Sequence, residues 1–303
     1  MWSLLTATCH DWFEDRAQRI GAALAFYAIF ALTPGLVIVM ALAGLLLGPR
    51  AESQIIEQFR QLIGKQGAHA IEATIQSAHK ETLGAAGTAL ALFPLVIGLW
   101  GVFGELQDGL NTIWGVTPKP GRRIRDVVKE RFLSFVMVVG IGFLLLVSLV
   151  LSAWLAAVST YVGTLLPAPA AVLEGVNFVI SFTVITGSFV LIFKLLPDVK
   201  VSWRDVWLGA AATSLFFTIG NLLIGLYLGR SAVASAYGAA GSLVVIVVWV
   251  YYSAQILLFG AEFTKVWTRR RGSGFVPEKT AIPVTQEARA EPGMGPPTSP
   301  SGR

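Results

Sequence analysis

Hydrophobic residues are gathered into six long stretches along this chain, and most charged residues lie between them. Each stretch holds the roughly 20 apolar residues that a helix needs to cross the ~30 Å hydrocarbon core of a bilayer. In lipid every backbone polar group must be paired internally, so a spanning segment is a helix or a barrel strand. Barrel strands alternate apolar and polar residues, whereas Val136–Ala157 is apolar apart from Ser148 and Ser152 and shows no such alternation. The stretches therefore predict helices, over about 22–48, 83–104, 132–158, 175–196, 206–228 and 240–264.

Composition supports this interpretation. Only 14% of the residues are charged, against about 25% in soluble domains. A soluble fold has too little polar surface to cover six apolar helices. We predict an all-α integral membrane protein, with a six-transmembrane-helix bundle over residues 1–268 and a disordered tail over 269–303, where proline, glycine and serine are frequent.

Two segments outside the spans are amphipathic. In residues 1–20, Trp2, Leu5 and Trp12 fall on one side of a helix. Such a helix either lies in the membrane interface or packs on the ends of the bundle. The loop 49–82 fits two amphipathic helices, which would cap the bundle, lie on the outer leaflet or cover a cavity.

The distribution of Lys and Arg predicts the orientation. Of these 23 residues, 18 lie on one side: before the first stretch, between the second and third, from the end of the fourth (Lys194) to the fifth, and after the sixth. Cytoplasmic loops carry the excess of Lys and Arg. Both termini are therefore predicted to be cytoplasmic, with 49–82 outside. The basic loop over 119–131 is suited to anionic lipid headgroups.

Polar side chains near or within the spans are the candidate functional residues, because such groups are costly in lipid. They are Glu105, Asp108 and Asn111 at i, i+3 and i+6, Asn177, Asn221, and Gln255 one heptad before Glu262. Each also has a structural interpretation. The acids lie near span ends, where they can meet water or pair with loop arginines, and an asparagine can bond to a neighbouring helix.

A proline in the first span and a run of small residues in the fifth predict a hinge and a helix-packing site. Pro34 interrupts the first span and is predicted to bend it, either as a gate or as a static kink. The small residues Gly209–Ala212 open the fifth span and allow close helix packing.

Residues for catalysis are sparse. Cys9 is the single cysteine, and His69 and His79 are not at ligand spacing. The chain carries no phosphate-binding loop, GxSxG or HExxH motif. We therefore expect no enzyme activity, no catalytic, cofactor or metal site, and no nucleic-acid partner.

Six segments in order resemble the YihY family of bacterial inner-membrane proteins, also called the virulence factor BrkB family. They are Ala22–Tyr27 with Pro34, Leu110–Trp114, Leu196-Pro197 with Trp203–Asp205 and Gly209-Ala210, Tyr237–Ser242, Trp249–Tyr252, and Gly260–Glu262. The resemblance covers roughly residues 10–268 and implies a six-span bundle in the inner membrane, which makes 49–82 periplasmic. It adds Tyr237 to the candidate residues. The family's older ribonuclease label finds no support in these residues.

Two functions fit this pattern. The first is a transporter or exporter of a lipid or another amphipathic envelope molecule. The second is a non-transporting scaffold or envelope-assembly factor that presents 49–82 to periplasmic partners. A homo-oligomer is compatible with either.

Cysteine labelling tests the predicted orientation. In intact cells an impermeant thiol reagent should label Ser77→Cys and leave Arg123→Cys unlabelled, because only the first lies outside. The reverse pattern would overturn the orientation and the loop assignments.

Overall fold

The computed structural model describes residues 2–31, 85–119, 170–230, 241–271 and 274–284, with the isolated positions 53, 56, 60 and 72. Helices make up most of these residues, as the apolar runs predict. They are α1 (Trp2–Glu14), a second helix over Ala17–Ala31, α4 (Ala85–Trp114), α6 (Ala170–Leu195), α7 (Trp203–Arg230) and α9 (Gly241–Arg271).

Three helices of the described part are long and apolar enough to cross a membrane: Phe178–Leu195, Trp203–Ile224 and Val244–Arg271. They match the predicted fourth, fifth and sixth spans. Helix α4 coincides with the predicted second span, and the first span is described as far as Ala31. The third predicted span, Pro34 and most of 49–82 lie outside the described residues. The complete six-span bundle therefore stays a prediction.

The outward face of α7 is apolar. Five large side chains on it are a third or more exposed: Leu215, Ile219, Leu222, Leu223 and Leu226. Water would penalise so much clustered apolar surface, whereas lipid tails are as apolar as leucine. This face is suited to contact with a bilayer.

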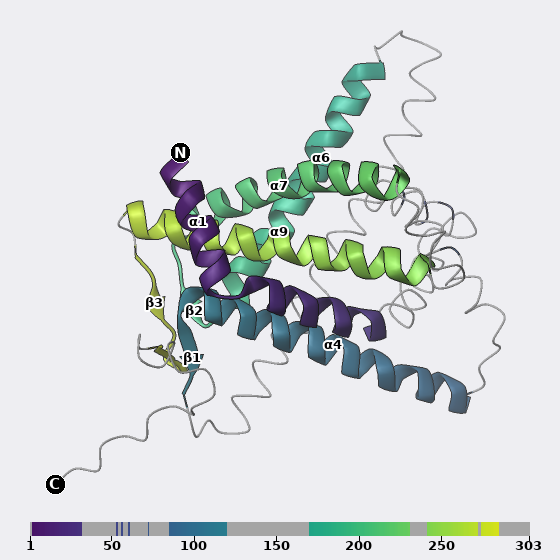
Figure 1. Ribbon diagram of the computed structural model, residues 1–303, viewed down its shortest axis with the longest axis horizontal. Coiled ribbons are helices and arrows are strands. Elements are labelled where there is room, and N and C mark those ends of the chain that lie inside the picture. The colour runs from purple at the N-terminus through teal and green to yellow at the C-terminus, as the bar shows by residue number, and fades with distance from the viewer. Residues whose placement is uncertain are drawn as a thin grey trace.

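Helix α9 lies at the centre of the described assembly. It runs beside α7 and also packs against α1 and α4, while α6 packs on α7 and crosses the other helices steeply (Figure 1). Thr186 of α6 bonds to Ser214 of α7 with a hydroxyl–hydroxyl distance of 3.0 Å.

Two glycine–threonine pairs hold α7 and α9 in close contact. Gly209 of α7 faces Thr264 of α9, and Thr213 of α7 faces Gly260 of α9. Each threonine hydroxyl donates to the carbonyl of the glycine four residues earlier in its own helix, Thr213 to Gly209 and Thr264 to Gly260. The hydroxyls are thus satisfied without a partner from the other helix, and the missing side chains of the glycines make room for them. This confirms the packing role predicted for the start of the fifth span.

Helix α1 packs on the last turns of α9. Leu4 lies in a cluster with Phe263 and Val266, and the guanidinium of Arg270 donates to the Ser3 hydroxyl and carbonyl. This supports the packed interpretation of α1. Trp2 and Phe13 nevertheless stay largely exposed, so contact with the membrane interface is compatible with the same structure.

Four short strands join loops at the end of the helices where α4, α6 and α9 finish (Figure 1). Strand β1 (Val116–Pro118) pairs antiparallel with β4 (Ala281–Pro283), and β2 (Val199–Lys200) pairs with β3 (Val276–Pro277). The prediction of a disordered tail from residue 269 is therefore wrong for 269–271, which continue α9, and for 274–284. Backbone pairing with the loops after α4 and α6 orders this segment despite its prolines and glycine.

Substitution of Gly260 tests the close approach of α7 and α9. A Cβ there would overlap the Thr213 side chain, so Gly260→Ala should destabilise the purified protein by about 1–3 kcal/mol. Thermal unfolding in detergent measures this. Gly175→Ala is the matched control in α6, because a Cβ at Gly175 meets no atom within 4 Å; equal stability losses in both variants would contradict the packing role.

Candidate functional site

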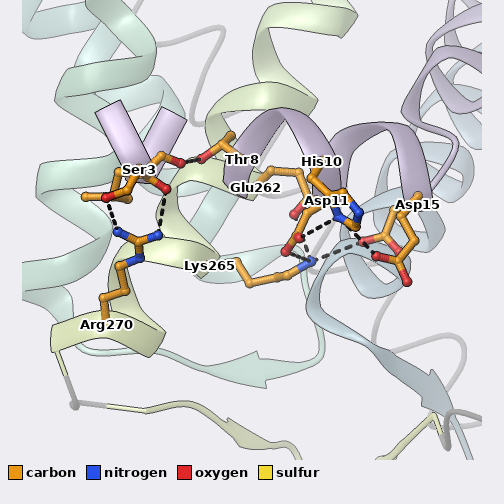
Figure 2. Close-up of polar contacts among 10 residues, drawn as sticks. Ser3, Thr8, His10, Asp11, Asp15, Glu262, Lys265 and Arg270 are labelled. Atoms are coloured by element: carbon orange, nitrogen blue, oxygen red, sulfur yellow. Dashed lines mark hydrogen bonds and ion pairs between the residues drawn. The ribbon is translucent and has the colours of Figure 1, made fainter. Parts of the chain in front are cut away.

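A lysine surrounded by three carboxylates lies where α1 meets α9 (Figure 2). The Lys265 Nζ atom is 2.8 Å from Glu262 Oε2, 3.1 Å from Asp15 Oδ2 and 3.3 Å from Asp11 Oδ2. The Lys265 and Glu262 side chains are at most 1% exposed, and that of Asp15 is 7% exposed. We call these four residues the lysine cluster.

Local helix geometry assembles the lysine cluster. Glu262 and Lys265 are three residues apart in α9, so they lie on one face. Asp11 and Asp15 are four residues apart, at the end of α1 and in the turn that follows it. Arg16 in that turn adopts a left-handed conformation with φ of 51°. This conformation ends α1 and turns the chain into the next helix, beside the ammonium group.

The lysine cluster holds more acceptors than donors. One ammonium group has three N–H donors and serves three carboxylates. Glu262 Oε1 is buried and has no hydrogen-bond partner among the described residues. A buried carboxylate oxygen without a donor is costly, so the cluster would gain from a further donor or positive charge.

A pocket of about 550 Å³ opens beside the lysine cluster. Asp11, Asp15 and Lys265 form part of its wall, together with Glu14 and Arg269. The remaining wall is mostly apolar and comes from the strand segments and the end of α4: Trp114, Gly115, Val116, Phe275, Pro277, Pro283 and Val284. Its volume lies in the range of small-molecule sites, about 300–1,000 Å³.

One group at the rim has metal-ligand spacing. The ligand atoms of His10, Asp11 and Glu14 lie within 4.8 Å of one another. His10 Nδ1 is 3.6 Å from Glu14 Oε2 and 3.8 Å from Asp11 Oδ1. The His10 side chain is 77% exposed, so this group lies at the surface rather than in a shielded metal site.

Asn111 belongs to a second buried polar contact. Its side-chain nitrogen donates to Asp198 Oδ2 at 3.0 Å, and its oxygen accepts from the Asp198 backbone N–H at 2.8 Å. Gln107 also donates to Asp198, at 3.5 Å. This double contact ties the end of α4 to the loop after α6, so the structure supports the structural interpretation of Asn111.

Of the predicted acids, Glu262 alone enters the lysine cluster. Glu105 is partly buried near Asp108, and burial first and that carboxylate second raise the pKa of Glu105. Asp108 is exposed. Glu262 pairs with Lys265 of its own helix rather than with a loop arginine.

The deeper amides occupy separate positions. A Cβ on Gly21 would overlap the amide of Gln255, so Gln255 packs from α9 against the Ala17–Ala31 helix. Both polar atoms of Gln255, and Oδ1 of Asn221 in α7, are buried with no partner among the described residues. Asn177 lies in α6, but the structure does not describe its side chain. Tyr237 and Pro34 lie outside the described residues.

Sequence reasoning missed Lys265, Asp11, Asp15 and Asp198 as site residues. Two local signals were present: Lys265 follows Glu262 at i+3, and Asp11 and Asp15 share a helical face. Their convergence carries no sequence signal, because Lys265 and Asp15 are 250 residues apart.

The long apolar helices with lipid-suited faces and a buried ionic cluster define a helical membrane protein. The chain belongs to the family described as Virulence factor BrkB, whose family model matches residues 8–283. This confirms the resemblance seen in the sequence and includes the strand segment beyond residue 268.

Curated relatives support the same class. The chain is 26% identical over 280 residues to a UPF0761 membrane protein of Pseudomonas aeruginosa (strain LESB58), covering 86% of this chain and 63% of that protein. It is 27% identical over 282 residues to one of Verminephrobacter eiseniae, covering 87% and 62%. The chain thus spans a little under two thirds of the length of these relatives. No solved structure matches the chain.

Removal of the central charge tests the lysine cluster. Lys265→Met leaves three carboxylates close together without a cation, and breaking a buried ion pair in this way costs about 3–5 kcal/mol. Thermal unfolding should show this loss. Adding Glu262→Gln to Lys265→Met should recover about 0.5–3 kcal/mol as coupling energy in a double-mutant cycle.

The exposed Lys279 in the turn before β4 provides a matched control. Lys279→Met should change stability by no more than about 0.5 kcal/mol. Additive effects of Lys265→Met and Glu262→Gln would show that the two groups are not energetically coupled.

Proposed function

We propose that this protein is a transporter that moves a lipid or another amphipathic envelope molecule across or out of the inner membrane. The observation that carries the proposal is the pocket beside the lysine cluster. Its wall combines charged and apolar surface, which suits a molecule with a polar headgroup. Ionisable residues buried in membrane proteins commonly mark substrate and ion pathways.

The lipid-suited faces of the helices support an amphipathic substrate. The pocket opens at the end of α9, and the outward face of α7 is apolar. A molecule whose headgroup enters the pocket can keep its hydrocarbon chains beside the helices. Such a substrate does not require a closed channel large enough for the whole molecule.

The orientation follows from the basic residues at this end. The last turn of α9 carries Arg269, Arg270 and Arg271, and Lys200 and Arg204 lie at the end where α6 finishes and α7 begins. An excess of such residues favours the cytoplasmic side. In this proposal the pocket opens to the cytoplasm, and the basic loop over 119–131 contacts anionic headgroups.

The proposed role is non-enzymatic and uses no cofactor. The sequence has no nucleotide-binding motif, so the driving force is a gradient, a partner protein or the gradient of the substrate itself. The scaffold remains the competing function. It requires partners for 49–82 rather than a working pocket.

Reconstitution separates the two functions. Liposomes that contain the purified protein should move fluorescent phospholipids or candidate ions faster than protein-free liposomes. Glu262→Gln should lower the flux more than it lowers the folded, inserted fraction, because it alters the lysine cluster while Asp11 and Asp15 still hold Lys265.

Glu278→Gln serves as the control, since Glu278 is exposed and does not line the pocket. Flux and insertion are measured in the same vesicles. If none of the tested lipids or ions crosses the liposome membrane faster with the protein than without it, the scaffold function is favoured. If Glu262→Gln lowers the flux only in proportion to the loss of folded protein, Glu262 stabilises the fold and has no separate role in transport.

A further inference from the structure

We infer that the pocket beside the lysine cluster recognises an organic ammonium group, either the amine of a lipid headgroup or a small free amine. This inference builds on the proposed function, because it specifies the chemistry of the molecule that the site accepts. Charge, hydrogen-bond donors, a helix end and wall composition each support it independently.

Negative charge exceeds positive charge at the pocket. Its wall carries the carboxylates of Asp11, Glu14 and Asp15 and the cations of Lys265 and Arg269. Glu262 lies directly behind Lys265 as a fourth acid, although it does not line the pocket. Lys265 is already shared among three of the four. A cationic ligand reduces this imbalance, whereas an anionic ligand increases it.

Hydrogen-bond donors are also scarce. Glu262 Oε1 is fully buried and has no partner among the described residues. Asp11 and Glu14 face His10 at distances too long for strong hydrogen bonds, 3.8 and 3.6 Å. A primary ammonium group carries three N–H donors and no acceptor. It can donate to Asp11 and Glu14, which frees Lys265 to serve Glu262 and Asp15.

Two helices end at the pocket wall. Glu14 is the last residue of α1 and Trp114 is the last residue of α4, and both line the pocket. The last turn of a helix exposes carbonyl oxygens and has a partial negative charge of about half an elementary charge. The end of α4 therefore favours a positive ligand, in agreement with the carboxylates, whereas the N-terminus of the Ala17–Ala31 helix lies close to the end of α1 and offsets its partial charge.

The size and aromatic wall favour an organic cation over a metal ion. A volume of about 550 Å³ is far larger than one ion. Trp114 and Phe275 pack edge to face with ring centroids 5.0 Å apart, and both line the pocket. Aromatic faces attract ammonium groups. Arg269 lies 6.0 Å from the Phe275 ring and provides the positive charge for an anionic part next to the amine.

Binding measurements on the full-length protein test this assignment. In nanodiscs of phosphatidylglycerol, ethanolamine should bind more tightly than tetramethylammonium, which has no N–H donor, at the same ionic strength. Glu14→Gln should weaken ethanolamine binding roughly twofold to fivefold, as expected for a half-exposed ion pair. Titration calorimetry gives both comparisons, and Glu278→Gln should bind as the unaltered protein does.

Lipid retention distinguishes the two sources of the amine. Native mass spectrometry from mixed nanodiscs compares phosphatidylethanolamine with phosphatidylcholine and phosphatidylglycerol. Preferential retention of phosphatidylethanolamine, reduced by Glu14→Gln, identifies a lipid headgroup. Ethanolamine binding without this preference identifies a free amine. Equal binding of ethanolamine and tetramethylammonium, or binding unaffected by Glu14→Gln, would overturn the assignment.

Ammonium binding and lipid transport are measured separately, so either can fail without the other. Ammonium binding without flux would leave the pocket assignment in place and remove the transport function. Flux of lipids that lack an amine, without ammonium binding, would support transport and remove the present inference.

Discussion

A single ammonium group, that of Lys265, joins the beginning of this chain to its last long helix. It is buried with Glu262 in α9 and reaches Asp11 and Asp15 at the end of α1. Desolvated charges are stable only when they are paired, so α1 must lie where its carboxylates meet the lysine. The position of α1 in turn closes one wall of the pocket. The site therefore depends on this ionic contact together with the apolar contacts of Leu4 with Phe263 and Val266.

Within the apolar part of the assembly a different constraint operates. Lipid tails offer no hydrophobic drive for helix association, so close van der Waals contact has to supply it. The reciprocal contacts of Gly209 with Thr264 and of Gly260 with Thr213 allow α7 and α9 to approach closely. They lie along the same stretch of α9 as Glu262 and Lys265. The helix that carries the central charge is thereby fixed in position by its neighbour.

The elements predicted from the sequence are those with a long-range pattern. The apolar runs of α6, α7 and α9 extend over many turns, and their composition identified them. Strands of two or three residues show no alternation, so the pairing of 276–277 and 281–283 leaves no sequence signal, and the prolines and glycines of the segment predict disorder instead. Glu262 was found because an acid at the end of an apolar helix is unusual. Lys265 lies just beyond the predicted sixth span, next to the basic residues of the tail, and the spacing of Asp11 and Asp15 does not distinguish a buried ion pair from a solvated helix face.

The short strands have a consequence for the order in which the protein is made. Residues 275, 277, 283 and 284 line the pocket, and β3 and β4 pair with loops that leave α4 and α6. A ribosome releases these residues after every helix of the described part has been synthesised. Until then Lys265 in α9 is already present for Asp11 and Asp15, but the pocket lacks the wall that the strand segments supply. The pocket wall is therefore completed only after the helices have been synthesised, and a chain interrupted before residue 275 carries these helices without the complete pocket.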